Sequence, residues 1–274
     1  MESKGLRVAL RIWVGLVLAF LFAPIVLIVL YSFNPSNIES WPIVGFTLHW
    51  YSVAFHDPQV RSAFLLSVKV ALLASVLAML LGSAVAYALH KFRFFGREAI
   101  SFLLVLPLAL PGIITGIALN SFFSFTGIRL GTITIVIGHT TFCIVVVFNN
   151  LIARLRRTPG SLSEASMDLG ARGWQTLSFV MLPLTATALV SGALLAFGLS
   201  FDEVIVTVFT AGAQNTLPLW IFGAIRLGQQ LPEVNAVVTI IILLTIIPVL
   251  LAARLAGAGS VTRSAAMEIP VGGG

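Results

Sequence analysis

The chain has 274 residues, of which 58% are hydrophobic and only 9% are charged, and its net charge is +6. A soluble domain carries about 25% charged residues, so this composition excludes a solvated globular surface and indicates an integral membrane protein. The length does not by itself require a second domain.

Six apolar stretches are long enough to cross a bilayer as helices, which takes about 20 residues each. They cover residues 12–33, 63–89, 99–123, 131–152, 179–201 and 235–255. We therefore expect an all-α integral membrane protein with six transmembrane helices in a single domain, 1–274. The first stretch has no cleavage site and is expected to remain as a span. The third contains Pro107, Pro111 and Gly112, so its helix is expected to kink near 107–112, where it either lines a pathway or has only an architectural role.

The basic residues are distributed unevenly between the segments that connect these spans. A cytoplasmic N-terminus puts most of them inside and few outside, which is the distribution that membrane proteins favour. We therefore expect both termini in the cytoplasm. The inside residues are then Lys4, Arg7, Arg11, Lys91, Arg93, Arg97, Arg154, Arg156, Arg157, Arg172, Arg254 and Arg263, and the outside ones are Arg61, Arg129 and Arg226.

Several polar or aromatic residues near the spans have two interpretations each. Trp50, in the first external loop, is either an aromatic anchor at the membrane interface or part of a substrate path. Lys69 either extends to the outer headgroups or belongs to a pathway. His139 is interpreted as a hydrogen-bonding partner between helices. No other His, Cys or carboxylate follows it at metal-ligand spacing, so no metal site is expected.

A polar insertion separates the fourth and fifth spans. Ser161 and Glu164 have the spacing of a capping box, which predicts a short helix over about residues 162–169. Gly170 provides the left-handed residue that ends such a helix. A second helix is predicted to start near 172–174 and to continue into the fifth span, with Pro183 inside it.

The spacing of this insertion resembles the EAA signature of ABC-importer permeases. That signature has Glu-Ala-Ala, three residues, Gly, nine residues, Ile, one residue and Leu-Pro; here Ser166 replaces the second Ala and Val180 the Ile. In that family the short helix docks on the ATPase subunit. The resemblance implies that a cytoplasmic coupling loop spans 153–178. Its coupling residues would be Glu164, Ala165, Ser166, Asp168 and Gly170. The alternative is an ordinary amphipathic surface helix.

The fifth span ends at the adjacent acids Asp202 and Glu203, which form either a solvated helix end or a cation-attracting rim. Five segments together resemble the spermidine/putrescine branch of these permeases: 32–34, 46–51, 139–143, 200–203 and 232–236. That resemblance implies a substrate pathway with Trp50, Ser200, Asp202 and Glu203. The chain departs from the branch at Gly112, where polyamine members carry an acid.

The resemblance implies the type I ABC importer permease fold, with a peripheral first span and a core over 62–255. It also implies a bacterial cytoplasmic membrane location and several partners. These are two ATPase subunits that bind ATP and Mg²⁺, a second homologous permease forming a heterodimer, and an extracytoplasmic solute-binding protein. No cofactor of the chain itself and no nucleic acid are expected. The chain has no Gly-x-x-x-x-Gly-Lys-Ser/Thr loop, so it is not expected to be an ATP-hydrolysing enzyme.

Three alternatives remain for the function. The same permease role with another small solute or ferric iron would use the same scaffold. An ion-coupled secondary transporter would need ionisable residues near mid-membrane, whereas Lys69 is the only charged residue well within a span and lies towards its outer end. An intramembrane enzyme would need a catalytic cluster, and the sequence offers none.

Overall fold

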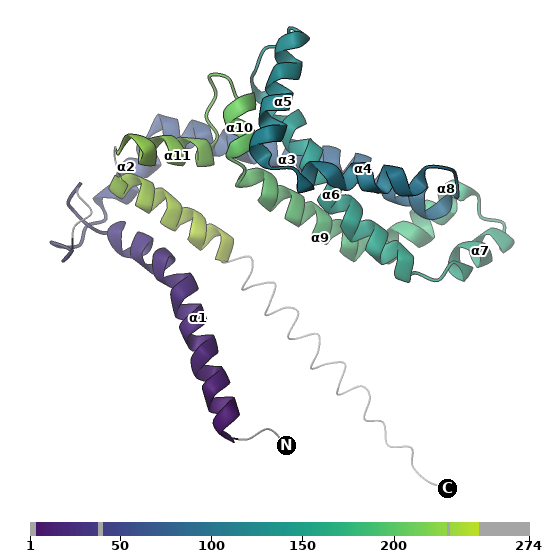
Figure 1. Ribbon diagram of the computed structural model, residues 1–274, viewed down its shortest axis with the longest axis horizontal. Coiled ribbons are helices and arrows are strands. Elements are labelled where there is room, and N and C mark those ends of the chain that lie inside the picture. The colour runs from purple at the N-terminus through teal and green to yellow at the C-terminus, as the bar shows by residue number, and fades with distance from the viewer. Residues whose placement is uncertain (1–3, 38–40, 229–230, 247–274) are drawn as a thin grey trace. The chain divides into compact units, whose positions relative to one another are not determined.

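A computed structural model describes residues 4–37, 41–228 and 231–246 (Figure 1). Within these ranges the chain forms helices and no strand. The elements are α1 (Lys4–Tyr31), α2 (His49–His56), α3 (Pro58–Lys91), α4 (Arg97–Ala109), α5 (Gly112–Phe125), α6 (Thr132–Arg157), α7 (Ser161–Asp168), α8 (Gly173–Gln175), the π-helix η1 (Thr176–Met181), α9 (Leu182–Phe201), α10 (Ile205–Thr210), α11 (Leu217–Leu227) and a last helix, Leu231–Ile246. The chain divides into two units: Pro58–Gly223, and Met1–Asp57 together with Ala224–Gly274.

Four of the described helices are long and apolar enough to span a membrane, which confirms a multi-pass membrane protein. They are Gly5–Tyr31, Pro58–Lys91, Thr132–Arg157 and Gly173–Phe201, and the bent pair α4–α5 makes a fifth if it is counted as one span. The sixth expected span, 235–255, is described only as far as Ile246. Its remainder lies outside the described residues.

The expected kink in the third span is confirmed as a complete break. α4 ends at Ala109, α5 begins at Gly112, and the two axes differ by 102°. Leu110 is extended because the ring of Pro111 crowds the helical conformation of the residue before it. Pro111 then serves as the N-cap of α5, where its missing N–H is not needed.

The core of the Pro58–Gly223 unit is a set of three helices, α3, α6 and α9, that pack side by side (Figure 1). Most residues on the packed face of α3 are small, which allows helix backbones to approach closely. An added Cβ on Gly82 would lie 3.0 Å from the carbonyl oxygen of Ile144 and 3.1 Å from the Cβ of Val147. The helices are therefore in contact at backbone distance. The buried small residues of α3 are Ala63, Ser67, Ala71, Ala74, Ser75, Ala78, Gly82 and Ala86.

The fifth span starts earlier than its most apolar part. The helical stretch Gly173–Phe201 runs through α8, η1 and α9 without a gap. Pro183 lies at the start of α9, directly after the six-residue π-helix. A proline ring clashes with the carbonyl one turn earlier in a regular α-helix, and a wider π turn is a common way of accommodating such a disruption.

The other unit contains α1, α2 and the last helix. After Arg11, α1 is apolar around its whole circumference, and its most apolar window has none of its residues buried. A helix of this kind is stable when lipid or another subunit surrounds it. The chain after α1 folds back on the end of that helix: the N–H of Thr47 donates to the carbonyl of Phe33 at 2.8 Å, and the hydroxyls of Ser32 and Tyr51 are 2.6 Å apart.

Candidate functional site

The residues that follow the fifth span form a short, half-buried helix, α10, rather than a simple loop. α10 packs on α5 and α6. At its start, a carboxylate oxygen of Glu203 accepts from the N–H of Val206 at 2.9 Å. At its end, the carbonyl of Phe209 accepts from Asn120 Nδ2 and that of Thr210 from Thr134 Oγ1, both at 2.7 Å. Backbone groups at membrane depth need such partners because no water is present there.

His139 connects three helices at the same place. It is 1% exposed, its Nδ1 lies 2.8 Å from Ser200 Oγ, and its Nε2 lies 2.9 Å from Thr207 Oγ1. A neutral imidazole donates through one nitrogen and accepts through the other, so both hydroxyls are satisfied. The interpretation of His139 as an interhelical partner is confirmed. We call residues 202–210, with these contacts, the α10 segment.

A cavity of about 160 Å³ lies between the α4–α5 break and the α10 segment. Most of its lining is apolar, and the carboxylate of Glu203 is the acidic group among its lining residues. Thr115 contributes a buried hydroxyl that has no hydrogen-bond partner among the described residues. Such a cavity suits a small cationic or polar group. The lining residues are Pro107, Leu108, Leu110, Gly112, Thr115, Phe142, Leu199, Glu203 and Val206.

The structure separates the four residues that the sequence assigned to a pathway. Glu203 lines the cavity, whereas the buried Ser200 is engaged with His139. Asp202 is the exposed C-cap of α9. Trp50 belongs to the other unit, where its indole N–H donates to the carbonyl of Asn34 at 2.8 Å. Ser200, Asp202 and Glu203 are thus neighbours at the end of α9 with different surroundings, and Trp50 belongs to the other unit.

Sequence reasoning missed the polar residues that hold the α10 segment. Asn120, Thr134 and Thr207 are hydrogen-bonded to it or within it. The available signal was a polar side chain inside an apolar span, as with Asn120 in 99–123. Such side chains usually find a partner on a neighbouring helix, but the sequence does not say which one.

The insertion before the fifth span forms α7, close to the expected 162–169. The expected capping box is wrong: α7 begins at Ser161, its N-cap is Gly160, and no side chain makes the cap bond. After Pro159 and Gly160, Ser161 is the first residue of the helix. The carbonyl of Gly160 accepts the first helical hydrogen bond, from the N–H of Glu164 at 3.2 Å. Glu164, Ala165 and Asp168 are exposed. We call residues 159–172 the α7 segment.

Gly170 ends this helix in the expected way. Its φ is +89°, in the left-handed region that glycine tolerates best. The N–H of Gly170 donates to the carbonyl of Met167 at 2.9 Å, and that of Ala171 to the carbonyl of Ser166 at 3.0 Å. This pair of bonds is a Schellman motif. The chain therefore reverses within a few residues and returns to the fifth span.

A contact between two side chains ties the α7 segment to η1 in the fifth span. Ser166 Oγ donates to or accepts from Thr176 Oγ1 at 2.8 Å, and it lies 3.0 Å from the carbonyl of Ser163. Thr176 is 2% exposed and is the first residue of η1. Ser166 therefore has a visible structural role, and Thr176 is a partner that the sequence did not reveal.

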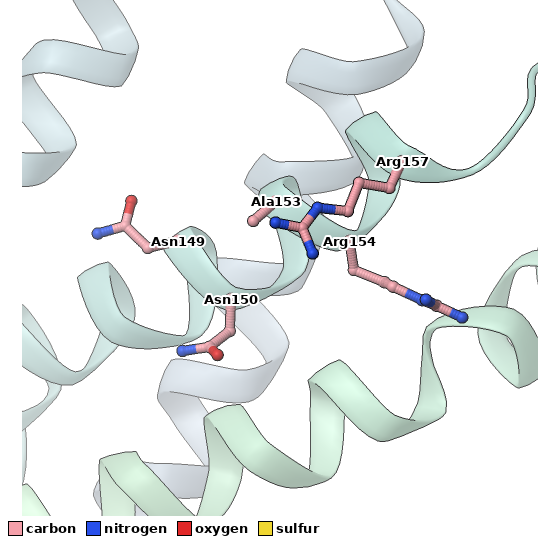
Figure 2. A pocket seen from close by; sticks show the side chains of 5 residues that line it. All are labelled: Asn149, Asn150, Ala153, Arg154 and Arg157. Atoms are coloured by element: carbon pink, nitrogen blue, oxygen red, sulfur yellow. The ribbon is translucent and has the colours of Figure 1, made fainter. Parts of the chain in front are cut away.

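A polar pocket of about 410 Å³ lies just before the α7 segment, along the last turns of α6 (Figure 2). It is lined by Asn149, Asn150, Ala153, Arg154 and Arg157. Arg154 extends towards α9, where its Nε donates to the carbonyl of Leu184 at 3.1 Å. Guanidinium and amide groups are suited to anions. The carboxylate among the residues that line the Glu203 cavity is suited to cations instead.

No group of three or more His, Cys, Asp or Glu side chains in the described part of the chain is arranged to hold a metal ion. Cys143 is buried and free.

Residues 78–258 match the family model described as "Binding-protein-dependent transport system inner membrane component". The chain is 37% identical over 237 residues to the spermidine/putrescine transport system permease protein PotC of Haemophilus influenzae, covering 86% of this chain and 91% of that one. It is 36% identical over 232 residues to the putrescine transport system permease protein PotI of Escherichia coli, covering 81% and 82%. Among solved structures, a bacterial ABC transporter involved in the import of the acidic polysaccharide alginate has the same fold. Its TM-score is 0.67 at 20% identity, over 94% of this chain and 98% of that one.

Proposed function

Because the chain belongs to the family of binding-protein-dependent transport system inner membrane components, we propose that it is a permease subunit of an ATP-driven ABC importer. It moves a solute inward by alternating access, while a partner subunit binds ATP with Mg²⁺ and hydrolyses it. The observation that carries the proposal is the exposed α7 segment, which is hydrogen-bonded to the start of the fifth span inside the matched region.

The α7 segment is the coupling element of this proposal. Glu164, Ala165 and Asp168 present an exposed face for an ATPase subunit. Four large apolar side chains are exposed close to them, as expected of a surface that a partner covers: Leu162, Met167, Leu169 and Trp174. The Schellman turn at Gly170 and the Ser166–Thr176 bond make the segment follow the fifth span. A displacement of α7 then moves η1 and α9 with it.

The proposed topology follows the basic residues. Both termini and the α7 segment lie in the cytoplasm, and the described arginine pocket at the end of α6 lies on that side. The permease domain comprises 1–274, with a peripheral first span, 12–33, a core over 62–255 and a coupling loop over 153–178. Six spans, including 235–255, complete it in a bacterial cytoplasmic membrane. A second, homologous permease forms a heterodimer with it. Two ATPases and an extracytoplasmic solute-binding protein complete the complex.

We further propose that the solute is a polyamine, as the names of the 35–37% identical relatives suggest. A polyamine presents ammonium groups joined by short methylene chains. The Glu203 cavity offers one carboxylate in an apolar lining, which matches that combination of charge and hydrocarbon. Asp202 and Ser200 lie beside it on the same helix end, and Trp50 provides an aromatic face in the external segment.

Gly112 sets the strength of the cation site in this proposal. It lines the same cavity as Glu203, and an added Cβ would meet only ordinary contacts, 3.5 Å from Ile205. An acid at this position would fit and would add a second carboxylate. A single carboxylate at Glu203 favours weaker binding of the cation, or a less charged one.

The alternative substrates are another small solute and ferric iron, since selection rests largely with the binding protein. An ion-coupled secondary transporter is the alternative of a different class. It would need neither an ATPase nor the exposed α7 segment, so association with an ATPase distinguishes the two.

The test is reconstitution of the chain in proteoliposomes with its candidate ATPase, second permease and binding protein. Putrescine and spermidine are expected to stimulate ATP hydrolysis in the presence of the binding protein. An amino acid and ferric ion serve as matched alternatives. Stimulation by one of these alone would refute the polyamine assignment and leave the permease role intact. Failure of any ATPase to associate with the chain would refute the permease role itself.

A further inference from the structure

Glu233 is a buried acid that the proposed function does not use. It lies in the first turn of the last helix, Leu231–Ile246, and is 1% exposed. The residues around it are buried too, among them Val234, Ala236 and Val237. Neither carboxyl oxygen of Glu233 has a hydrogen-bond donor within reach among the described residues. A buried carboxylate without a donor or a cation is strongly unfavourable.

The group that faces Glu233 is a second acid. Asp57, the C-cap of α2, belongs to the same unit, and its carboxyl is within hydrogen-bonding range of Glu233. Two ionised carboxylates are both acceptors and repel each other. Such a pair is joined only when one member carries a proton. The absence of a donor to Glu233 and the closeness of Asp57 are therefore explained together if a proton lies between them.

The electrostatics of the site agree with this explanation. Burial, followed by the charge of Asp57 and a hydrogen bond to its carboxyl, raises the pKa of Glu233 from 4.5 to about 7. The other ionisable side chains on α2 and at the end of α11 are exposed, namely His49, His56 and Arg226. Tyr51, on α2, is engaged with Ser32.

We propose that Asp57 and Glu233 form a proton-binding carboxyl pair that joins the external segment containing α2 to the start of the last helix. With the proton bound, the pair is a short hydrogen bond between two elements that are far apart in the sequence. Without it, the buried carboxylate of Glu233 faces that of the half-buried Asp57, and the contact between α2 and the last helix is weakened. On the topology of the proposed function, which this placement rests on, the pair faces the outside, so outside pH would regulate transport.

The direct test is infrared difference spectroscopy of the full-length chain in lipid nanodiscs, titrated from pH 5 to 9, where a protonated carboxyl has its own absorption band. The wild type is expected to lose this band as the pH rises through about 7. Glu233→Gln should lack the change. Glu98→Gln, which alters an exposed acid in the first turn of α4, should retain it. A band that is unaffected by Glu233→Gln, or that titrates near pH 4.5 as an ordinary glutamate does, overturns the proposal.

A second variant and the addition of metal ions provide two further tests. Asp57→Asn places an amide donor beside Glu233, which favours the carboxylate and should shift the titration to lower pH. Loss of the protonated band on addition of Mg²⁺ or Ca²⁺ at constant pH would mean that a metal ion occupies the pair, and it would overturn the proton assignment. None of these measurements needs transport, so they are independent of the permease proposal.

The dependence of thermal stability on pH provides a second measurement if the infrared bands of different carboxyl groups overlap. A native pKa above the unfolded value means that the folded chain binds the extra proton, so this contribution is fully present below pH 4.5 and is lost as pH rises through about 7. Thermal unfolding of the wild type should therefore show a falling midpoint over that window. Glu233→Gln, whose amide can donate permanently to Asp57, should remove the fall. Equal slopes in both proteins contradict the proposal.

Discussion

The α7 segment and the α10 segment contact opposite ends of the same fifth span, but they are held in different ways. The α7 segment is exposed, and one side-chain hydrogen bond, Ser166 to Thr176, connects it to η1. The α10 segment is held to neighbouring helices by three such bonds, from His139, Asn120 and Thr134, and Glu203 makes a further one within it. The exposed α7 segment suits a surface that a partner binds. The anchored α10 segment suits a rigid boundary of a cavity.

This difference indicates that the two ends of the span have separate roles in the proposed importer. Force is applied at the end that is accessible and lightly attached. We expect substrate to meet the other end, where side chains of Asn120, Thr134 and Glu203 hydrogen-bond to the backbone. Changes to the α7 segment should therefore affect coupling and leave the stability of the chain almost unchanged. Changes to the α10 segment should affect stability or substrate affinity.

The largest effect is expected for Gly170→Asp. The substitution strains a backbone with φ +89° by about 1 kcal/mol and displaces the exposed face of α7. Transport should fall roughly a hundredfold, as misplacement of a working element can cause, while membrane insertion remains normal. Uptake assays and co-purification of the ATPase measure this. Gly160→Asp, at a non-strained position before the helix, is the control. Wild-type uptake in Gly170→Asp would refute the coupling role.

His139→Leu should have the next largest effect, on stability rather than on coupling. It leaves the hydroxyls of Ser200 and Thr207 buried without their imidazole partner. We expect the free energy of unfolding to fall by about 1–3 kcal/mol. Thermal unfolding in detergent measures the loss. Thr141→Val, which removes only a bond to the carbonyl of Gly138 on the same helix, should lose less. Equal losses would mean that the network does not hold the α10 segment.

Glu203→Gln removes the negative charge at the cavity and retains the hydrogen bond that begins α10. The glutamine oxygen can still accept from the N–H of Val206, so the start of α10 is retained, but the charge is lost. For a cationic substrate we expect KM to rise roughly tenfold, the loss of one charge-assisted contact. The uptake rate as a function of substrate concentration measures this. Gly112→Asp, which adds a carboxylate to the same cavity, should change KM in the opposite direction. An unchanged KM in both variants would exclude this cavity from the pathway.

Thr176→Val should have the smallest effect. It removes the hydroxyl that meets Ser166 and preserves the shape of the side chain. One hydrogen bond of this kind contributes about 1 kcal/mol, so the amount of ATP hydrolysed per solute transported should rise about two- to fivefold. Ser178→Ala, in the same π-helix but with bonds only to Trp174 and Gln175, is the matched control. A ratio unchanged from the wild type would mean that this bond does not couple the two elements.

Some parts of the molecule could be predicted from local patterns. The break at Pro111 and the left-handed Gly170 were anticipated because each depends on the residue itself and its neighbours. The prediction of a capping box at Ser161 was wrong. The same Ser-x-x-Glu spacing also occurs when the helix starts one residue earlier, after a Pro-Gly turn, and Ser161 is then inside the helix and not its N-cap. The partners of Asn120 and Thr134 could not be predicted, since they lie on α10, which is about 75 to 90 residues distant in the sequence.

The sequence by itself determined that this is a multi-pass membrane protein with a polar insertion of family-specific spacing, since composition, apolar run length and turn residues are properties of the chain alone. The packing of the helices adds three facts: Ser200 is engaged with His139, Glu203 both begins α10 and lines a cavity, and Asp57 meets Glu233. The physical reason is that a polar side chain in an apolar setting needs a partner. Which partner it finds depends on how the helices pack.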